Sequence, residues 1–312
     1  MSIRGPLAGL VRPAVLPPSA RIAILAPSSP ADPARIEASA EALRQLGHQV
    51  SIAPNVADRF NGYLAGDDDL RVSLFNEAIR SEHVDAMLFA RGGYGAMRIL
   101  DRIDFASLAA RPRPVVGFSD VTAILSAVAA MSGVVSFHGP LMSVDFFEGL
   151  SPEKERWFWS LMRGDAPLEW SFNTTDVLSP GRVEGIVFGG CLSVLTALIG
   201  TPYEYWVNDG IWFWEDVNEP TYRIDRMLTH LRLSGRLNSL RAVMIGSLKG
   251  CGSEDPGELD GLLDSFFGGA GIPVIRDLPF GHNGDNLTIP IGVLGQIDTD
   301  RLTIRFPEPA VE

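Results

Sequence analysis

The residue at position 119 stands where the sequence changes character. Ser119 follows the apolar, β-branched run of residues 114–118 and precedes apolar residues at helical spacing, so it is expected at a strand-to-helix turn. A serine at such a turn is either the N-cap of the helix or a nucleophile lifted on a tight turn. The nucleophile pattern Gly-x-Ser-x-Gly is half matched, because Gly117 is present and Val121 replaces the second glycine. Both interpretations remain open on this stretch alone.

A serine nucleophile needs a base within hydrogen-bonding reach, and the chain contains five histidines. His48 and His83 precede expected strands, which puts them at the wrong edge of a sheet, and His230 lies on a polar helix face. His138 ends an expected strand at the correct edge, where it could instead brace a turn through a hydrogen bond. His282 lies in the glycine-rich loop PFGHNGDN, which can present a side chain. Position alone favours His282 slightly over His138.

The stretch IWFWEDVNEP, residues 211–220, supplies a candidate acid. Alternation along an extended strand places Ile211 and Phe213 on the same face as Glu215. A carboxylate at the end of so apolar a strand is costly to remove from water unless a partner stabilises it. That partner is either the catalytic histidine or Arg223, and a third interpretation makes Glu215 a cap of the helix expected from residue 220 onward.

The loop ARGGYG, residues 90–95, ends the third expected strand. Consecutive glycines let backbone N–H groups approach a ligand, which suits an oxyanion hole as well as a phosphate. A dinucleotide fingerprint would require glycine at the position of Arg98, and it normally follows the first strand, where APSSP stands instead. The loop therefore gives little support to a nicotinamide cofactor.

Strand and helix signals alternate through the first half of the chain. Strands are expected at residues 21–26, 49–53, 85–90, 114–118 and 134–137, and helices at residues 33–46, 67–80, 96–103 and after Ser119. Repeated βα units predict an α/β fold with a doubly wound, mostly parallel sheet of the Rossmann or flavodoxin-like kind. The site of such a sheet lies at the carboxyl ends of its strands.

The same signals divide the chain into four segments. Residues 1–20 are expected to form a loose N-terminal extension, and residues 21–150 the α/β nucleophile domain. Residues 151–180 are expected to be a linker because they contain the polar run SFNTTDVLSPG. Residues 181–312 mix strand and helix signals, which predicts a smaller α+β domain that carries the acid and the base.

The composition narrows the class of partner. A net charge of −12 over 312 residues disfavours nucleic acid and anionic membranes, because both bind basic surfaces. No apolar run reaches the roughly 20 residues of a membrane span, and prolines interrupt the N-terminal segment, so a cytoplasmic protein is expected. Cys191 and Cys251 are too few for a disulfide scaffold or a structural zinc site. No metal and no other cofactor is expected.

The chain resembles the LD-carboxypeptidase (muramoyltetrapeptide carboxypeptidase) family of serine peptidases, whose relatives include the microcin C immunity amidases. The resemblance runs from about residue 21 to the last strand and rests on the ordered motifs ARGGYG, VVGFSD, FHGP, FGG-LSVL-GT, WEDVNEPTYRIDRML and PFGHNGDN. It implies Ser119 as nucleophile, Glu215 as acid and His282 as base. It also implies an oxyanion hole made by the backbone N–H groups of Gly93 and Asp120.

By resemblance, the substrate is a cytoplasmic murein tetrapeptide, cut between the L-centre of its diamino acid and its terminal D-alanine during peptidoglycan recycling. A small peptide with a D-amino-acid C-terminus requires a carboxylate-binding residue, for which Arg91 and Arg223 are candidates, and Tyr94 is expected to contact it. The family implies a homodimer. Cys191 departs from the family, which usually has Asn after Gly-Gly, so an amide that could orient substrate is missing.

Two other functions remain alternatives. The first is an amidase or peptidase that acts on a peptidyl-nucleotide antibiotic, as the immunity relatives do. The second is a non-catalytic α/β ligand-binding protein that retains the motifs by descent.

Overall fold

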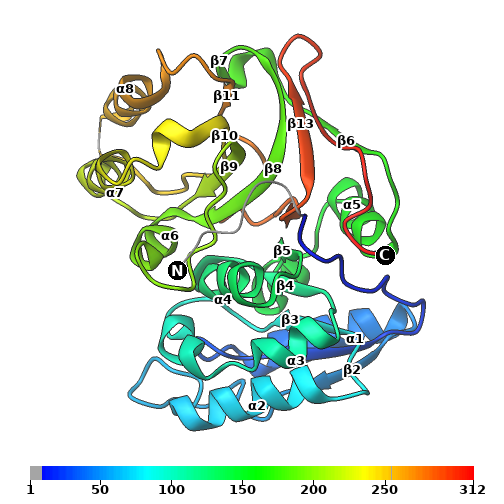
Figure 1. Cartoon of the computed structure of the whole chain (residues 1–312). Helices are drawn as coiled ribbons and strands as arrows, with labels where there is room; N and C mark the ends of the chain where they lie inside the picture. The colour runs from blue at the N-terminus through cyan, green and yellow to red at the C-terminus, as the bar shows by residue number, and fades with distance from the viewer. Residues whose placement is uncertain (1–8, 254) are drawn as a thin grey trace.

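The computed structural model describes residues 9–253 and 255–312, and it stacks two sheets one above the other (Figure 1). The lower sheet has the strand order β12-β5-β4-β3-β1-β2. Strands β1 to β5 pair in parallel, and only β12 runs antiparallel to its neighbour. The structure thus confirms the predicted doubly wound, mostly parallel sheet.

The strands of the lower sheet are β1 (Arg21–Leu25), β2 (Gln49–Ile52), β3 (Ala86–Phe89), β4 (Val115–Gly117), β5 (Ser136–His138) and β12 (Ile289–Ile291). Its helices are α1 (Pro33–Gln45), α2 (Asp68–Arg80), α3 (Phe105–Ala110) and α4 (Thr122–Ala127). Residues 96–102, expected as an α-helix, form the 3₁₀ helix η1 (Ala96–Arg102). The short helix η2 (Ser119–Val121) joins β4 to α4, and a π-helical turn, η4 (Met142–Phe146), follows β5.

The upper sheet has the strand order β6-β14-β13-β8-β9-β10-β11-β7. Its centre, β8 to β11, is parallel, and the outer strands on both sides are antiparallel. The strands are β6 (Leu168–Ser171), β7 (Val177–Ser179), β8 (Arg182–Cys191), β9 (Gly210–Glu215), β10 (Leu240–Ile245), β11 (Val274–Ile275), β13 (Leu294–Asp298) and β14 (Thr303–Phe306). The helices are α5 (Pro152–Arg163), α6 (Leu192–Leu198), α7 (Thr221–Leu233) and α8 (Pro256–Phe267).

The segment 151–180, expected as a linker, is part of the upper layer. It forms helix α5 and the strands β6 and β7, which pair with β14 and β11 at opposite edges of the upper sheet. Edge strands such as β6 alternate between half-buried and exposed residues, so their sequence is polar enough to look like a loop. With these strands the upper sheet has eight strands and the lower sheet six.

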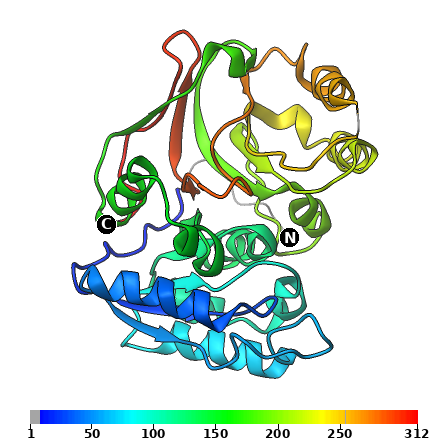
Figure 2. The same cartoon turned by 180° about the vertical axis from the view of Figure 1, so that it is seen from behind.

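Two segments tie the layers together. Strand β12 comes from the second half of the chain but pairs with β5 of the lower sheet, with Ile289 opposite His138. Seen from behind, the orange-to-red part of the chain reaches down to the lower layer (Figure 2). Residues 9–20, expected to be loose, are also held: Val11 bridges Val134, and the Leu16 N–H donates to the Met162 carbonyl at 2.9 Å. The apolar side chain of Leu16 is buried, which explains why this stretch is ordered. The first eight residues of the expected extension lie outside the described residues.

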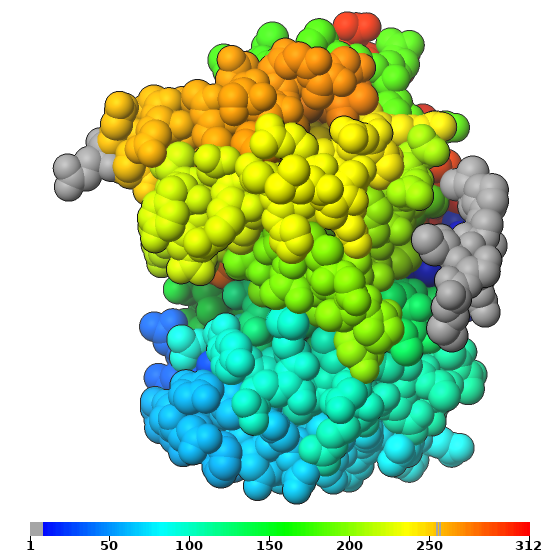
Figure 3. All heavy atoms as spheres, turned by 60° about the vertical axis from the view of Figure 1, so that its left-hand side comes forward, coloured from blue at the N-terminus to red at the C-terminus, as the bar shows by residue number. Residues whose placement is uncertain are grey.

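Strands β4 and β9 run through the two cores. All three residues of β4 and all six of β9 are buried, because helices and the opposite layer cover both faces of each strand. Trp212 and Trp214 of β9 stack on each other with ring centroids 5.8 Å apart. The positions that can reach a ligand are therefore at the carboxyl ends of these strands, and Figure 3 shows a notch between the two layers on its left-hand side.

Among the described residues, no helix combines the length and the apolar character needed to cross a membrane.

Candidate active site

Ser119 follows β4 directly and has a left-handed backbone, with φ of 63°. A non-glycine residue in this region is strained, and such strain is typical of a nucleophile held on a sharp strand-to-helix turn. In the described part of the chain, the Ser119 hydroxyl hydrogen-bonds only to His282 and caps no helix. The N-cap interpretation of this serine was therefore wrong.

The structure brings together the three residues that the sequence singled out for acyl-transfer chemistry. His282 Nε2 lies 3.0 Å from Ser119 Oγ, and His282 Nδ1 lies 2.6 Å from Glu215 Oε2. A proton on Nδ1 satisfies both contacts, because Nδ1 then donates to the carboxylate and Nε2 accepts from the hydroxyl. Ser119 stands at the end of β4, Glu215 is the last residue of β9, and His282 lies in the loop between β11 and β12.

Gly281 and Asn286 set the position of this histidine loop, and the sequence analysis did not single them out. Gly281 has φ of +95°, and a Cβ added there would lie 2.6 Å from Glu215 Oε2, so only glycine fits. The Gly281 N–H donates to Asn286 Oδ1 at 2.8 Å, and Asn286 is buried. The glycine immediately before His282 in PFGHNGDN was the signal for the first of these residues.

The contact with Glu215 makes protonation of the His282 imidazole more favourable than that of a free histidine. Burial lowers the pKa of His282, but the hydrogen bond and the charge of Glu215 outweigh this effect, so the pKa of His282 lies above its ordinary value. The charges of Asp216 and Asp145 act in the same direction. Asp145, on η4, is itself fully buried, which raises its pKa to about 6. Asp145 was not among the residues expected from the sequence, because its place next to the site depends on the turn after β5.

The glycine loop after β3 reaches the nucleophile through Gly92. A Cβ added to Gly92 would lie 2.7 Å from Ser119 Cβ and 3.4 Å from the backbone nitrogen of Asp120. Gly93 has φ of +103°, and a Cβ added there would overlap the Ser29 hydroxyl. The loop is held by two bonds with Ser29, whose N–H donates to the Gly92 carbonyl at 3.2 Å and whose Oγ accepts from the Tyr94 N–H at 3.1 Å. Gly93 was expected at the site from the sequence and Gly92 was not, although both stand in the same motif.

The residues expected to bind substrate lie on different elements. Arg91 is exposed, and its Nη1 donates to the Pro30 carbonyl at 3.0 Å. Tyr94 is 52% exposed. Arg223, on α7, forms an ion pair with Glu219 at 2.7 Å and none with Glu215. The interpretation that Glu215 pairs with Arg223 or caps α7 was therefore wrong, because Glu215 turns toward the histidine instead.

His138 is a core residue. Its side chain is fully buried and its ring packs against Phe118, Phe213 and Phe280, with centroid distances of 5.3 to 6.0 Å. Among the described residues neither ring nitrogen has a hydrogen-bond partner, so the expected turn-bracing bond is not formed. Burial lowers the pKa of His138 to about 3, which keeps the ring neutral.

Cys191 occupies the contact between the two layers. Its N–H donates to Thr122 Oγ1 on α4 at 3.1 Å, and its Sγ lies 3.6 Å from Asp216 Oδ1. The thiol is buried. Within residues 9–253 and 255–312, no group of three or more His, Cys, Asp or Glu side chains could hold a metal ion.

A hydroxyl, an imidazole and a buried carboxylate in series, at the carboxyl ends of parallel strands, define a site of the serine-hydrolase class. The family comparison specifies that class further. The family model described as the LD-carboxypeptidase N-terminal domain matches residues 22–139, and the model of the LD-carboxypeptidase C-terminal domain matches residues 184–297. The chain belongs to the LD-carboxypeptidase family. The resemblance noted in the sequence and the expected enzyme class, a serine-type LD-carboxypeptidase, are confirmed.

Relatives match the chain along nearly all of its length. A Streptomyces coelicolor protein is 40% identical over 97% of this chain and 98% of its own. The murein tetrapeptide carboxypeptidase of Pseudomonas aeruginosa is 31% identical over 92% of this chain and 95% of its own. The crystal structure of muramoyltetrapeptide carboxypeptidase from Oxalobacter formigenes superposes with a TM-score of 0.81 at 30% identity, covering 91% of this chain and 97% of that one. The structure of the microcin C7 self-immunity protein MccF in complex with aspartyl sulfamoyl adenosine shares the fold. It superposes with a TM-score of 0.87 at 22% identity and covers 97% of this chain and 100% of that one.

Proposed function

We propose that this enzyme hydrolyses the bond between the L-centre of the diamino acid and the terminal D-alanine of murein tetrapeptides, through a triad of Ser119, His282 and Glu215. One observation carries the triad: the continuous contact from Ser119 Oγ through the imidazole to the buried Glu215 carboxylate, at 3.0 and 2.6 Å. The substrate is supported by the family and by the names of the relatives.

In the proposed reaction His282 Nε2 takes the proton of Ser119 as Oγ attacks the scissile carbonyl carbon. The imidazolium then gives this proton to the D-alanine nitrogen, the C–N bond breaks, and an ester to Ser119 remains. Water attacks the ester with His282 as base, and the shortened peptide leaves with a free carboxylate. Glu215 holds the Nδ1–H tautomer and stabilises the imidazolium in both halves of the reaction.

The backbone N–H groups of Gly93 and Asp120 are the proposed oxyanion hole. Asp120 lies in the first turn of η2, where backbone N–H groups have no partner within the helix. The Gly93 N–H makes no hydrogen bond to another described residue. Gly92 supports the proposal by bringing the glycine loop against Ser119 and the Asp120 nitrogen. Donors fixed in this way stabilise the negative charge that forms on the carbonyl oxygen.

Of the two arginines, Arg91 is better placed to bind the terminal carboxylate of the substrate. It immediately precedes Gly92, which lies against Ser119, and it forms no ion pair with a described acidic residue. Arg223 remains a second candidate but already pairs with Glu219. Tyr94, three residues after Arg91 and exposed, would form a wall beside the peptide. From the family we also infer a cytoplasmic location and a homodimer, which cell fractionation and light scattering test.

The deciding experiment measures the amino acid released from two tetrapeptides that differ only in the configuration of their last alanine. We expect release of D-alanine and no release of L-alanine, because inverting that centre moves the carboxylate away from its binding residue while the carbonyl stays at Ser119. The variant Ser119→Ala serves as the enzyme control. Equal rates on the two epimers would contradict the proposed specificity, and no release from either would contradict the substrate.

A second candidate function is cleavage of a peptidyl-nucleotide, as in the microcin C immunity relatives. One observation favours it: the exposed rings of Tyr63 and Tyr94 lie 5.8 Å apart, tilted by 58° to each other, and offer aromatic faces at the glycine loop. Assaying a peptidyl-adenylate analogue beside the tetrapeptide separates the two functions. A non-catalytic binding protein, the third alternative, would leave Ser119 unlabelled by a fluorophosphonate reagent.

A further inference from the structure

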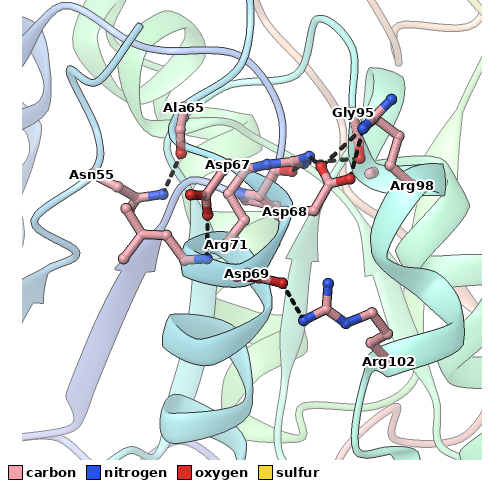
Figure 4. A network of polar contacts seen from close by, with 12 residues as sticks. Asn55, Ala65, Asp67, Asp68, Asp69, Arg71, Gly95, Arg98 and Arg102 are labelled. Carbon is pink, nitrogen blue, oxygen red and sulfur yellow. Dashed lines mark hydrogen bonds and ion pairs between the residues drawn. The ribbon is translucent and has the colours of Figure 1, made fainter. Parts of the chain in front are cut away.

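Arg71 is an arginine on α2 whose side chain is fully buried, although it contacts none of the three proposed catalytic residues. Burying a guanidinium is costly unless its donors are satisfied. Here the Nη1 group donates to two backbone carbonyls, those of Pro27 and Gly95, the second at 2.9 Å, and the Nη2 group pairs with Asp68 (Figure 4). Each of the two carbonyls belongs to a different loop.

These loops are the ones that border the nucleophile. Pro27 lies in the loop after β1, whose Ser29 hydrogen-bonds to Gly92 and Tyr94. Gly95 ends the glycine loop after β3, which contains Gly92 and the proposed oxyanion donor Gly93. Arg71 therefore joins the two loops.

A second bond ties the same point to the nucleophile turn. The N–H of Ala96, the residue after Gly95, donates to Asp120 Oδ2 at 2.8 Å. Asp120 follows Ser119 and supplies the other proposed oxyanion donor. Gly95 has φ of +128°, and a Cβ added there would lie 2.8 Å from Arg71 Nη1, so the guanidinium fits against the bare backbone. The glycine loop is thus held at its end by Arg71 on one side and by Asp120 on the other.

Neighbouring side chains fix the guanidinium and the first loop. Asp68, which pairs with Arg71, also forms two bonds to Arg98, at 2.7 and 3.0 Å (Figure 4). Asn55 is buried, and its Nδ2 donates to the carbonyls of Ala26 and Ala65 at 3.1 and 2.7 Å. The backbone carbonyls of Ala26 and Pro27 are therefore held by an amide donor and a guanidinium donor from outside the site.

We propose that Arg71 is a positioning residue that sets the distance between the glycine loop and the nucleophile turn, and so aligns the oxyanion donors of Gly93 and Asp120. The proposal rests on the proposed serine mechanism. It predicts that the loss of Arg71 lowers kcat more than it raises KM, because the oxyanion donors act mainly after the carbonyl has been attacked.

The chain offers a matched control in Arg113. This arginine is also buried, and its Nη1 donates to the carbonyls of Ala78 and Ser81, at 3.0 and 2.9 Å, at the other end of the same helix. Arg113 precedes β4, at the edge of the sheet opposite to Ser119. Removing Arg71 deletes a side-chain donor to two carbonyls that border the site, and removing Arg113 deletes one to two carbonyls that do not. In each pair one carbonyl keeps a second donor: Gly95 accepts from the Arg98 N–H at 3.2 Å, and Ser81 accepts from Arg111 Nη1 at 3.1 Å.

The experiment compares Arg71→Met, Arg71→Lys and Arg113→Met by melting temperature, by kcat and KM for the tetrapeptide ending in D-alanine, and by the rate of fluorophosphonate labelling. We expect Arg71→Met to lower kcat about 100-fold, the effect of a misplacement of about 1 Å, with KM changed less than about threefold. Arg71→Lys keeps the charge but has no planar fork for two carbonyls, so we expect an intermediate kcat. Arg113→Met should lower the melting temperature and leave kcat within about threefold.

The outcomes distinguish failure of the Arg71 proposal from failure of the proposed function. If Arg71→Met and Arg113→Met lose kcat equally at equal folded fraction, or if folded Arg71→Lys has the kcat of the wild type, Arg71 has only a structural role. If the wild type neither cleaves the peptide nor reacts with the reagent, the proposed function fails and the Arg71 proposal falls with it. If the wild type reacts with the reagent but cleaves another substrate, the labelling rates of the variants still test Arg71. Should Arg71→Met not fold, Arg71→Lys carries the test.

Discussion

Ser119 and Glu215 each stand at the carboxyl end of a fully buried parallel strand, β4 in the lower sheet and β9 in the upper one. Ser119 is displayed by the strained turn that follows its strand, with φ of 63°. Glu215 is still part of its strand and contacts His282, which is 67 positions further along the chain. The proposed nucleophile is therefore built by consecutive residues, whereas the proposed acid and base are brought together by packing.

The loop that carries His282 joins the two sheets. It begins after β11 of the upper sheet and ends at β12, which pairs in the lower sheet. The proposed base thus lies in a loop that joins the two sheets, while the proposed nucleophile belongs to the lower sheet alone. Changes in the histidine loop should disable the base and leave the serine turn intact, and each prediction below tests this separation.

The largest effect is expected from removing the nucleophile or the base. Ser119→Ala and His282→Ala should each lower kcat roughly 10⁴- to 10⁶-fold, because neither residue can work without the other. For the same reason the double variant should be scarcely slower than either single variant. Steady-state kinetics of the three proteins, with folding checked by thermal melting, measure this.

His138→Ala is the control for the choice of base. This ring is packed among phenylalanines and should cost about 3 kcal/mol of stability when removed, with a much smaller loss of kcat than His282→Ala. If His138→Ala abolishes turnover in a folded protein while His282→Ala retains it, the base has been assigned to the wrong histidine.

A smaller effect is expected from Glu215→Gln, about 10⁴-fold or less in kcat, because a histidine without its carboxylate is still a poor base. The pH dependence should change as well. His282 must be neutral to accept a proton, and its raised pKa places the acid limb of kcat/KM above the ordinary histidine value of 6.5. Removing the Glu215 charge lowers that pKa, so the limb should move to lower pH. A limb that stays in place in Glu215→Gln would mean that another group controls it.

The histidine loop can be disturbed without substituting a residue of the proposed triad. Gly281→Ala places a Cβ against Glu215 and should lower kcat about 100-fold through misplacement of the pair. Gly284→Ala is matched to it: Gly284 lies in the same loop with φ of +82°, but its added Cβ would meet only Glu148, at 3.5 Å. Both variants carry backbone strain, and only the first reaches the site. Fluorophosphonate labelling and kcat are measured side by side, and equal impairment of Gly284→Ala would show that loop strain, rather than contact with Glu215, causes the loss.

The sequence predicted the nucleophile half more completely than the acid–base half. The run around Ser119 contains its strand, its turn and its helix within 20 residues, so local periodicity was enough to place it. Position alone favoured His282 over His138 only slightly, because both follow apolar segments that end near the same sheet edge, and the family resemblance added the stronger reason. In the structure His138 points into a cluster of aromatic rings formed by residues distant in sequence, which supports that choice.

Other features depend on long-range pairing and left no local signal. β6 and β7 look like loop because an edge strand needs few apolar residues, and nothing in the segment around Ile289 says which sheet it joins. Arg71 stands in an acidic helix start, DDDLR, where an exposed ion pair is the ordinary expectation. Its burial follows from the position of two loops that the sequence does not relate to each other.

The smallest effect is expected from modifying the cysteines, which lie in the upper half near Glu215 and Asp216. Burial, together with the charges of these two carboxylates, raises the pKa of Cys191 far above its usual value, and burial raises that of Cys251 to about 11. The thiolate is the species that reacts with alkylating reagents, so both residues should react slowly at neutral pH.

Treatment of the native enzyme with iodoacetamide at pH 7.5 should therefore leave kcat/KM within about twofold, with Cys191 unmodified by peptide mass spectrometry. Unfolded protein, treated in the same way, should be alkylated at both positions. Cys191 contributes to the packing of the two layers through its backbone N–H, which donates to Thr122 of α4. Its thiol lies near Asp216 and contacts neither Ser119 nor His282. Rapid alkylation of Cys191 with loss of activity would show that reagent and substrate share a path between the layers. The upper half would then contribute a side chain to the substrate site in addition to the acid and the base.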